Sequence, residues 1–471
     1  MSKKTTSPKF RIEKDSLGPK EVPFNAYWGV QTQRAVENYP ISGLHEHPLF
    51  VDAFVLLKQC AALTNKELKV LPQKKANAIV KACEEILNGA LRDQFVVDVF
   101  QAGAGTSHNM NVNEVIANRA NELLGGKKGD YKPVGPNDDV NMSQSTNDAF
   151  PTAMRLSLLL MLMEFFPVLE DLRKAFAKKA KEFDKIIKSG RTHLQDATPI
   201  RLGQEFGGYA YAMDRNLERL SFAADELCEL GIGGTAVGTG LNAHPKYRAV
   251  IVKYLSKAMN IKLRMSGNYF EAMQSMGPFV TLSSALKNLA VDITRIANDL
   301  RLLSSGPTTG LKEIQLPSVQ PGSSIMPGKV NPSIAEMMNQ ICYHVIGTDT
   351  TITMCAQAGQ MELNVMMPVM IFDLLFSMEA MKNGMRVFNE RCVAGITADK
   401  ARCEWYAHKS ASVVTALNPI IGYNRAAEIA KESVKTGKTV REVVIEQKIM
   451  TPQAFDKAVQ LMKLTEPGIS E

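Results

Sequence analysis

Four short segments of the sequence are unusually rich in hydroxyl, amide and glycine residues. They are Gly105-Thr106-Ser107, Ser145-Thr146-Asn147, Thr192-His193 and the run from Gly322 to Pro332, which reads GSSIMPGKVNP. Each of them alone has a simple structural interpretation, because Ser, Thr and Asn cap helices and form turns. Together they supply hydroxyls, amides, one histidine and one lysine, a set of groups that can bind a small polycarboxylate.

Several rival kinds of site do not fit the spacing of these residues. In the last segment, five residues separate Gly322 from Gly328, whereas a phosphate-binding loop has four residues between these glycines. Val330 follows the lysine, where such a loop has a Ser or Thr hydroxyl. Residues 231–240 lack the Gly-x-Gly-x-x-Gly spacing of a dinucleotide-binding fold, and no Gly-x-Ser-x-Gly hydrolase motif occurs. The seven histidines show no metal-ligand spacing, so the sequence predicts neither a nucleotide site nor a metal site.

Composition favours helices and a small-molecule partner. Of the 471 residues 45% are apolar but only 7% are aromatic, and 24 are methionine, which suits helix packing better than sheet packing. The net charge is +7, yet the basic residues interleave with acidic ones, as in residues 173–188, which predicts solvated helix faces. No compact basic run with aromatic residues occurs, so we expect no nucleic-acid partner.

Cysteine usage and hydropathy predict a cytoplasmic protein without a membrane partner. The seven cysteines form no CxxC pair and are odd in number, which indicates free thiols in a reducing compartment. Residues 1–10 are polar and basic, so we expect no signal peptide. The longest apolar stretch, Leu156 to Met163, is interrupted by Ser157 and is too short to span a bilayer.

The elements that must position these residues are mainly helices. Residues 1–48 are rich in proline and predict loops, and polar loops are also expected at residues 101–118, 125–147, 190–199, 231–245 and 306–332. Helical spacing of apolar residues predicts helices at residues 49–68 and 73–89, and long ones at 151–188, 201–230, 276–305, 332–358 and 368–392. Helices of such length are typical of a large bundle. The predicted class is all-α, with a mainly helical N-terminal domain (1–145), a central long-helix bundle (146–400) and a small C-terminal helical domain (401–471).

The run from Gly322 to Pro332 resembles the signature of the aspartase/fumarase superfamily. Five further segments resemble those of the family in the same order: residues 101–117, 137–152, 190–206, 233–242 and 304–317. The resemblance therefore covers essentially the whole chain from about residue 11. It implies a three-domain fold whose long helices form a multi-helix core shared in a homotetramer, with each active site built from segments of three chains.

Within the superfamily the sequence is most similar to the aspartate ammonia-lyases. Ser107 follows Thr106, and Thr146 stands between a serine and an asparagine, where class II fumarases usually have glutamine and serine. Gly135 occupies the position of a fumarase histidine that belongs to a secondary anion site. Fumarase-like features are also present, at residues 28–34, 196–199 and 233–240, and His193 occurs in both groups.

Three functions follow from this resemblance and remain open. The first is the reversible deamination of L-aspartate to fumarate and ammonia, the second the hydration of fumarate to L-malate, and the third a catalytically silent structural oligomer. The family usually has arginine where this chain has Thr308, which leaves the local packing of that loop open.

The resemblance also implies the roles of the site residues in the deamination. Four hydroxyl groups would bind the β-carboxylate of the substrate: those of Thr106, Ser145, Thr146 and Ser324. Lys329 and Asn331 would bind the α-carboxylate, and three residues would surround the amine: Asn147, Thr192 and His193. Such donors would stabilise the second negative charge of an aci-carboxylate intermediate, which is where they contribute most to the rate.

The expected general base is Ser323, and the catalytic group comprises Ser323, His193 and Lys329. A serine hydroxyl is a weak base, so backbone N–H groups of the glycine-containing loop and nearby Lys329 would have to lower its pKa. Ser324 is the alternative base by position, and a flexible loop between Gly322 and Gly328 could close over the substrate. No organic cofactor is implied. Some aspartases respond to Mg²⁺, but the sequence offers no ligand cluster for a metal.

Overall fold

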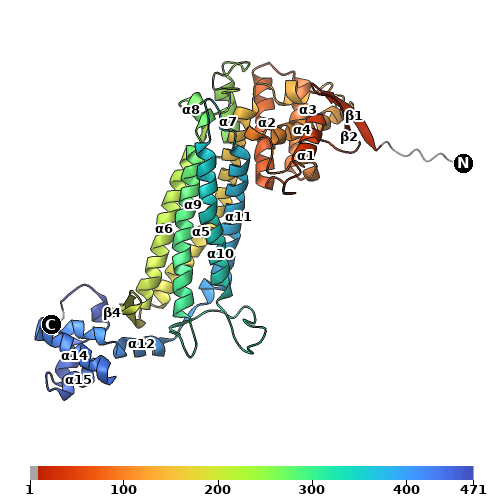
Figure 1. The fold of residues 1–471 in the computed structure, drawn as a ribbon. Coiled ribbons are helices and arrows are strands. Elements are labelled where there is room, and N and C mark those ends of the chain that lie inside the picture. Colours follow the sequence, from red (N-terminus) through yellow and green to blue (C-terminus); the bar gives the residue numbers. More distant parts are fainter. Residues whose placement is uncertain (1–8, 470–471) are drawn as a thin grey trace. The chain divides into compact units, whose positions relative to one another are not determined.

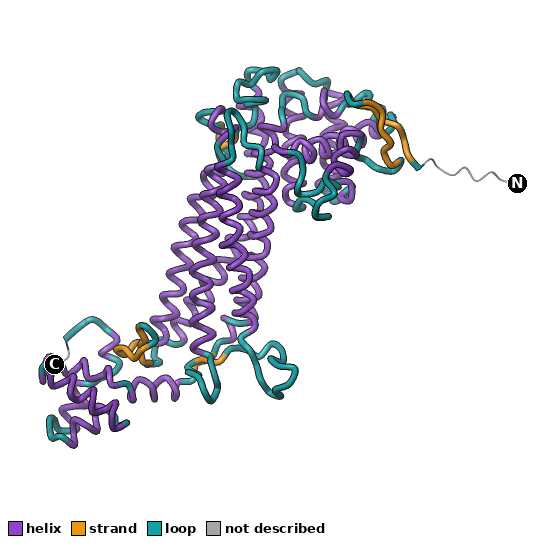
Figure 2. Tube along the Cα trace, viewed as in Figure 1, coloured by secondary structure: helices purple, strands orange, loops and turns teal. Residues whose placement is uncertain are grey.

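The computed structural model describes residues 9–469, and helices dominate it, as the all-α prediction requires (Figures 1 and 2). The polar residues 1–8, on which the expectation of no signal peptide largely rests, lie outside the described residues. The helices of the first third are α1 (Val30–Asn38), α2 (Pro48–Glu67), α3 (Gln73–Leu87) and α4 (Thr106–Leu123). A short π-helical turn follows at Pro136–Val140.

Five long helices confirm the central part of the prediction, with ends that differ from the expected ones by a few residues. They are α5 (Thr146–Glu182), α6 (Leu202–Leu227), α9 (Gly277–Leu303), α10 (Ser333–Gln357) and α11 (Met367–Arg391). Buried side chains join them to one another: Asn216 of α6 donates to Asp292 of α9 at 2.7 Å, and the ring of Phe176 of α5 meets that of Phe388 of α11. The apolar periodicity of the sequence therefore produces a helical bundle.

The remaining helices are shorter. They are α7 (Tyr247–Met259), α8 (Tyr269–Gln274), α12 (Lys400–Lys409), α13 (Asn418–Ile421), α14 (Tyr423–Thr436), α15 (Val440–Glu446) and α16 (Pro452–Ala458). Gly437 ends α14 in the left-handed conformation (φ +72°), and a capping box of Thr439 and Glu442 begins α15. The last helices share a small apolar core that includes Leu417, Ile429 and Val444, each fully buried.

The chain forms two compact units, both assembled from separate segments. Unit 1 comprises residues 1–165, 218–288 and 344–380, and unit 2 comprises residues 166–217, 289–343 and 381–471. Each of the five long helices contributes one segment to each unit. The division of the sequence into three domains stays a prediction.

Three of the expected loop regions contain strands, the third being residues 306–332 with the two-residue strand β7 (Ile314–Gln315). Residues 1–48 include an antiparallel hairpin of β1 (Phe10–Asp15) and β2 (Gly18–Pro23), besides α1. Residues 190–199 belong to a second hairpin, β3 (Ile187–Thr192) with β4 (Gln195–Arg201). The other strands are two residues long, namely β5 (Glu229–Leu230), β6 (Arg264–Met265), β7 (Ile314–Gln315) and β8 (Thr397–Ala398). The strands of the two hairpins are short and rich in Pro, Gly and charged residues, so they show no clear alternation of apolar and polar residues. The prediction of loops in these regions was therefore wrong.

The asparagine-rich segment after residue 101 was also predicted wrongly, because it is the buried helix α4. Its buried asparagines bind neighbouring segments, Asn109 and Asn113 through side chains and others through the backbone. Asn111 donates to the Gln94 carbonyl at 2.9 Å, and Asn121 exchanges two hydrogen bonds of 2.8 Å with the backbone of Val134. Buried amides that are fully hydrogen-bonded can occupy a core, although their polarity imitates a loop in the sequence.

Helix α5 is long and apolar enough, by length and composition alone, to cross a membrane. Two thirds of its most apolar window (67%) is nevertheless buried inside the fold, and Phe150, Leu158 and Met161 are fully covered by other residues. A helix covered on most sides in this way is a core helix of the bundle.

Candidate functional site

The ten residues predicted to form the site fall into two groups, one in each unit. Unit 1 contains Thr106, Ser145, Thr146 and Asn147, and unit 2 contains Thr192, His193, Ser323, Ser324, Lys329 and Asn331. The residues of the first group were predicted in loops. Three of them instead occupy the first turns of helices, with Thr106 at the start of α4 and both Thr146 and Asn147 at the start of α5.

The first group gathers polar side chains at two helix N-termini. Gly105 precedes α4 in the left-handed conformation (φ +80°), and a Cβ atom there would lie 1.9 Å from the ring of Phe150 in α5. Glycine therefore permits the start of α4 to pack directly against the first turns of α5. Free backbone N–H groups and the helix dipole make such N-termini favourable for anions, so both helices suit a carboxylate.

Asp148, which the sequence did not single out, holds this group in place. Its side chain is fully buried, and one carboxylate oxygen accepts a hydrogen bond from the backbone of Ser145 at 2.8 Å. The other oxygen accepts backbone N–H groups of Gly233 and Thr235 at 2.8 and 2.9 Å. Burial raises the pKa of Asp148 to about 6. The carboxylate thereby joins the start of α5 to the glycine-rich segment at residues 233–240.

Behind the first group lies a fully buried lysine, Lys58 of α2. Its ammonium group donates to three amide oxygens, those of Asn109 (2.7 Å), Asn141 (2.9 Å) and Gln144 (3.1 Å). The amide nitrogen of Asn109 in turn donates to the hydroxyl of Thr146 at 3.0 Å. Burial lowers the pKa of Lys58 to about 7, whereas the three acceptors favour its protonated form.

The position of Lys58 in the sequence indicates that its side chain is buried. Lys58 stands four residues after Phe54 and three before Ala61, so it falls on the apolar face of the predicted helix. A lysine on such a face requires buried polar partners, and these come from α4 and from the turn before α5.

The second group centres on Ser323. Its hydroxyl oxygen accepts hydrogen bonds from the backbone N–H groups of Ile325 (3.2 Å) and Met326 (2.9 Å). The loop is closed by Gly322, whose N–H donates to the Lys329 carbonyl at 2.7 Å and whose carbonyl accepts the Asn331 amide at 2.7 Å. A Cβ atom on Gly322 would lie 2.7 Å from backbone atoms of both residues, so only glycine fits.

Most of this loop is open to solvent. Ser323 and Asn331 are half-buried, while residues 324–330, including Ser324 and Lys329, are exposed. The loop and the residues before it line a cavity of about 500 Å³. Gly328 takes the left-handed conformation (φ +81°) in which a side chain would be strained.

Thr192 and His193 lie at the tip of the β3–β4 hairpin and are exposed. His193 and Leu194, the two residues of the turn, both have positive φ values, +55° and +59°. This is the pattern of a type I′ turn, which Asn and Gly normally occupy. Backbone strain of this kind is concentrated at functional sites, so its presence at His193 agrees with a role for the hairpin tip.

A buried cluster of charges anchors the same hairpin. Glu313, which is fully buried, accepts Lys188 of β3 at 3.1 Å and Arg191 of β3 at 2.9 Å, and Lys188 also pairs with Glu205 at 2.8 Å. Glu313 lies in the segment that leads to Ser323, so the cluster ties the hairpin to that segment. The sequence analysis did not single out any of these four residues.

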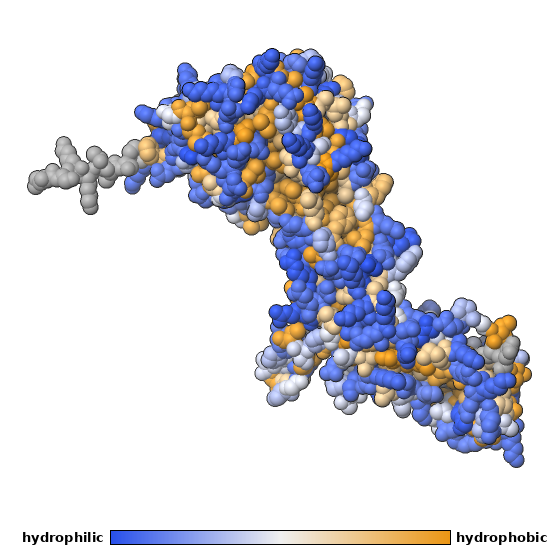
Figure 3. Space-filling model, turned by 180° about the vertical axis from the view of Figure 1, so that it is seen from behind, coloured by the Kyte–Doolittle hydropathy of each residue, from blue (hydrophilic) through white to orange (hydrophobic). Residues whose placement is uncertain are grey.

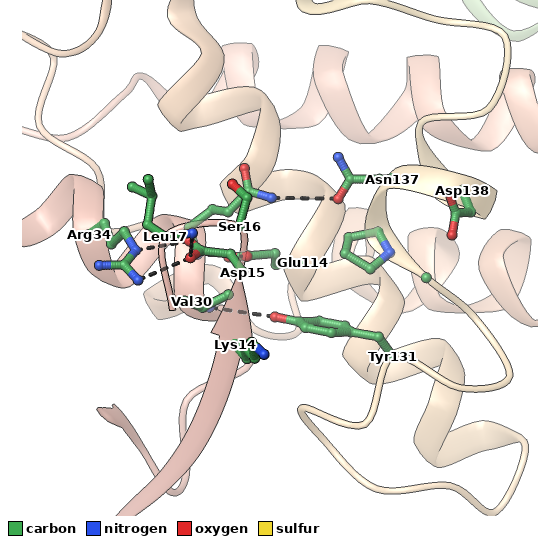
Figure 4. A pocket seen from close by; sticks show the side chains of 13 residues that line it. Lys14, Asp15, Ser16, Leu17, Val30, Arg34, Glu114, Tyr131, Asn137 and Asp138 are labelled. Atoms are coloured by element: carbon green, nitrogen blue, oxygen red, sulfur yellow. Dashed lines mark hydrogen bonds and ion pairs between the residues drawn. The ribbon is translucent and has the colours of Figure 1, made fainter. Parts of the chain in front are cut away.

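A larger cavity of about 560 Å³ lies elsewhere in unit 1 and contains none of the ten predicted residues (Figure 4). Three of its titratable groups are already engaged, since Arg34 pairs with Asp15 at 2.8 Å and Glu114 accepts the backbone N–H groups that begin α1. Burial raises the pKa of Glu114 to about 7. Gly135, which replaces the fumarase histidine, also lines this cavity. These contacts indicate that the cavity wall mainly fastens α1 and the first hairpin.

In the part of the chain that the structure describes, no group of three or more His, Cys, Asp or Glu side chains could hold a metal ion. The effect of Mg²⁺ stays a prediction. All seven cysteines are free, and all except the half-buried Cys355 are buried. The prediction of free thiols is confirmed.

Comparison with known proteins agrees with this geometry over nearly the whole chain. The sequence profile of the Lyase family matches residues 18–347, and that of the fumarase C C-terminus matches residues 413–466. Aspartate ammonia-lyase of Bacillus subtilis (strain 168) is 48% identical over 461 residues, which cover 98% of this chain and 97% of that protein.

Two solved structures are similar along their full length. The fumarate lyase:delta crystallin from Brucella melitensis bound to cobalt is 50% identical with a TM-score of 0.94, and the match covers 97% of this chain and 100% of that one. A class II fumarase from Schistosoma mansoni is 36% identical with a TM-score of 0.95, covering 97% and 99%. The chain belongs to the Lyase family, and the resemblance to the aspartase/fumarase superfamily is confirmed.

Proposed function

We propose that the protein catalyses the reversible deamination of L-aspartate to fumarate and ammonia. The observation that carries the proposal is the setting of Ser323, whose hydroxyl oxygen accepts two backbone N–H groups at 3.2 and 2.9 Å. Such donors stabilise an alkoxide and so lower the pKa of the hydroxyl, which a serine base requires. The near full-length similarity to an aspartate ammonia-lyase supports aspartate as the substrate.

The proposed reaction begins with proton transfer. The Ser323 oxygen takes a proton from the carbon next to the β-carboxylate, and the electrons left behind delocalise into that carboxylate as an aci-carboxylate. Hydroxyl groups at the two helix N-termini, those of Thr106, Ser145 and Thr146, and the hydroxyl of Ser324 donate to the developing charge. Donors fixed before the reaction stabilise this charge without reorganising, which is why they lower the barrier.

The carbon–nitrogen bond breaks in the second step. The electron pair of the aci-carboxylate forms the carbon–carbon double bond of fumarate, and the protonated amino group (–NH₃⁺) leaves as ammonia with the electrons of the broken bond. Asn147, Thr192 and His193 would surround the leaving group, while Lys329 and Asn331 hold the α-carboxylate by charge and hydrogen bonding. No cofactor takes part in this scheme, and a cytoplasmic location accords with the free thiols.

A decisive experiment replaces Ser323 by alanine and follows fumarate formation by its ultraviolet absorbance. We expect the Ser323→Ala variant to lose at least about 100-fold in kcat while fumarate still binds, because a general base contributes 10²–10⁴. The Ser324→Ala variant is the matched control and should lose less. Near-normal turnover of Ser323→Ala would contradict the assignment of the base.

The choice of substrate is tested in the same assay. Turnover of L-aspartate supports deamination, turnover of L-malate alone would identify a fumarate hydratase, and turnover of neither would identify a structural oligomer. The similarity to a class II fumarase makes L-malate the necessary comparison.

We also propose that the protein is a homotetramer in which several chains complete each site. The resemblance to the aspartase/fumarase superfamily implies this assembly, and the ten site residues divide between unit 1 and unit 2.

Helix α10 offers a surface for such an assembly. Its exposed residues from position 340 onward include no Lys, Arg, Asp or Glu; they are Gln340, Tyr343, His344, Gly347, Thr350, Thr351, Thr353, Met354 and Gln357. The steps of three and four between positions 340, 343, 347, 350, 354 and 357 are those of a coiled-coil seam. Other apolar residues also reach the surface, in patches among hydrophilic ones (Figure 3).

Gly347→Glu tests this assembly. A side chain at Gly347 would meet no atom of the same chain within 4 Å, so the subunit should still fold. A carboxylate on a face that becomes buried between subunits would be costly, so we expect smaller species in sedimentation and loss of activity. An active tetramer of unchanged size would contradict the proposed interface.

A further inference from the structure

The Lys58–Asn109–Thr146 chain is a polar relay that connects a buried cation to a proposed substrate-binding hydroxyl. Its members come from three helices, α2, α4 and α5, and all three side chains are buried. Its two hydrogen bonds are short, 2.7 Å from Lys58 to Asn109 and 3.0 Å from Asn109 to Thr146. We infer that Lys58 and Asn109 are positioning residues, which direct the proton of the Thr146 hydroxyl toward the substrate carboxylate.

The first step of the argument concerns the orientation of the Asn109 amide. The ammonium group of Lys58 has only donors, so the atom of Asn109 that faces it must be the oxygen. The nitrogen must then face Thr146, which is the arrangement in the structure. Without the lysine, an asparagine amide could turn over and present its oxygen to the threonine instead.

The second step concerns the Thr146 hydroxyl. A hydroxyl has one proton to donate and two lone pairs. Because Thr146 accepts a hydrogen bond from Asn109, its own proton must point in another direction. Within residues 9–469, no protein atom accepts that proton, so it is free for a carboxylate at the start of α5. The relay therefore makes Thr146 a donor toward the site.

The third step concerns charge. No carboxylate lies within hydrogen-bonding distance of Lys58 in the described residues; its three partners are the neutral amides of Asn109, Asn141 and Gln144. A neutral amine has two N–H groups, so three acceptors favour the ammonium form. The buried carboxylate of Asp148 offsets part of this charge, so Lys58 acts mainly by fixing the orientation of the Asn109 amide.

Asn109→Asp is the most informative variant. The new carboxylate would keep an acceptor toward Lys58 and neutralise its charge, so the fold should not lose stability. It would also place an acceptor against Thr146, whose hydroxyl would then turn inward and no longer donate to the substrate. We expect fumarate affinity, measured by calorimetry, and kcat/KM for L-aspartate to fall by about 100-fold, the effect of losing one such donor.

The matched control is Asn111→Asp in the same helix. Asn111 is equally buried but binds the backbone of Gln94 and Val96, with no link to Thr146. This variant should lose stability, because its carboxylate would face the Gln94 carbonyl, while its fumarate affinity stays within about threefold of the wild type. A positioning role thus predicts that Asn109→Asp loses fumarate affinity but not stability, and that Asn111→Asp loses stability but not affinity.

A double-mutant comparison shows whether the effect passes through Thr146. If it does, adding Asn109→Asp to Thr146→Val should lower fumarate affinity by less than about threefold, because the hydroxyl to be directed is already absent. Losses that multiply would overturn the inference, as would an Asn109→Asp variant with normal affinity. Lys58→Met gives a second test, since it should weaken fumarate binding even where it leaves the fold intact.

This inference rests on the proposed role of Thr146, and the two can fail separately. Wild-type affinity of Thr146→Val alone would reject Thr146 as a substrate ligand, and with it both the role and the relay. If Thr146→Val lowered fumarate affinity as expected but Asn109→Asp did not, only the relay would be rejected. Fumarate is the common product of aspartate and malate, so its binding tests the relay whichever leaving group the enzyme uses.

Discussion

Two buried lysines, one in each unit, lie in opposite electrostatic surroundings. Lys58 in unit 1 is fully buried and meets only amide oxygens, at 2.7 to 3.1 Å. Lys188 in unit 2 is almost as buried, at 2% exposure, but pairs with the carboxylates of Glu205 and Glu313 at 2.8 and 3.1 Å. The same residue type therefore serves two purposes, which follow from whether a carboxylate or an amide contacts its ammonium group.

The paired cluster of unit 2 balances two cations with two anions. Lys188 and Arg191 lie on one hairpin strand, and their shared partner Glu313 fixes that strand against the segment leading to Ser323. A balanced cluster contributes little net field but fixes geometry. The cation of unit 1 is hydrogen-bonded by neutral amides alone, and its counter-charge, Asp148, acts through space. We place this cation behind the helix N-termini that would bind a carboxylate.

The largest effect should come from unbalancing the paired cluster. Glu313→Gln would leave Lys188 and Arg191 with only Glu205 as a counter-charge, in a buried position. Breaking a buried ion pair in this way costs about 3–5 kcal/mol, so the free energy of unfolding should fall by that amount. Guanidinium unfolding measures the loss.

The control for this prediction is a surface pair of similar geometry. Arg441 and Asp456 meet at 2.7 Å with both side chains about half exposed, 46% and 55%. Arg441→Gln should leave the free energy of unfolding almost unchanged, because solvent screens the pair. Equal losses in the free energy of unfolding of the two variants would show that burial does not strengthen the Glu313 cluster.

A smaller effect, with a definite sign, distinguishes the unpaired lysine. Burial lowers the pKa of Lys58 from 10.5 to about 7, so above pH 7 the folded protein releases a proton that the unfolded chain retains. The unfolding free energy should therefore rise with pH by about 1.4 kcal/mol per unit between pH 7 and 9, and fall as pH drops toward 7. Lys58→Met should lack this component, so the difference between the two proteins isolates it. Parallel pH profiles would contradict the lowered pKa.

Features that are local in the sequence were predicted better than contacts between distant residues. The residues of the Ser323 loop were named from the resemblance of one unbroken run of eleven positions, and their roles stay predictions. The five long helices were equally accessible, since apolar spacing is a local property of the chain. Local order in the sequence was sufficient for these helices.

Lys58, Asn109, Asp148 and Glu313 were missed for the opposite reason. Each acts through a partner far away in the chain: Lys58 is 51 residues from Asn109, and Arg191 is 122 residues from Glu313. Asparagine in α4 also imitates a loop, because sequence polarity does not reveal that a buried amide is hydrogen-bonded. Contacts of this kind require the fold before they can be recognised.

The smallest expected effect concerns the hairpin tip that the paired cluster anchors. Leu194 is held at φ +59°, a conformation that costs a residue with a side chain about 1 kcal/mol and glycine almost nothing. Leu194→Gly should therefore be more stable than Leu194→Ala, which removes the same exposed side chain but keeps the strain. Thermal unfolding of the two variants measures the difference. Because the strain also fixes His193, we expect Leu194→Gly to raise KM for L-aspartate while Leu194→Ala does not. If the Leu194→Gly variant were no more stable than Leu194→Ala, the backbone at the hairpin tip would be unstrained. The ion pairs of Glu313 would then not be needed to hold the hairpin.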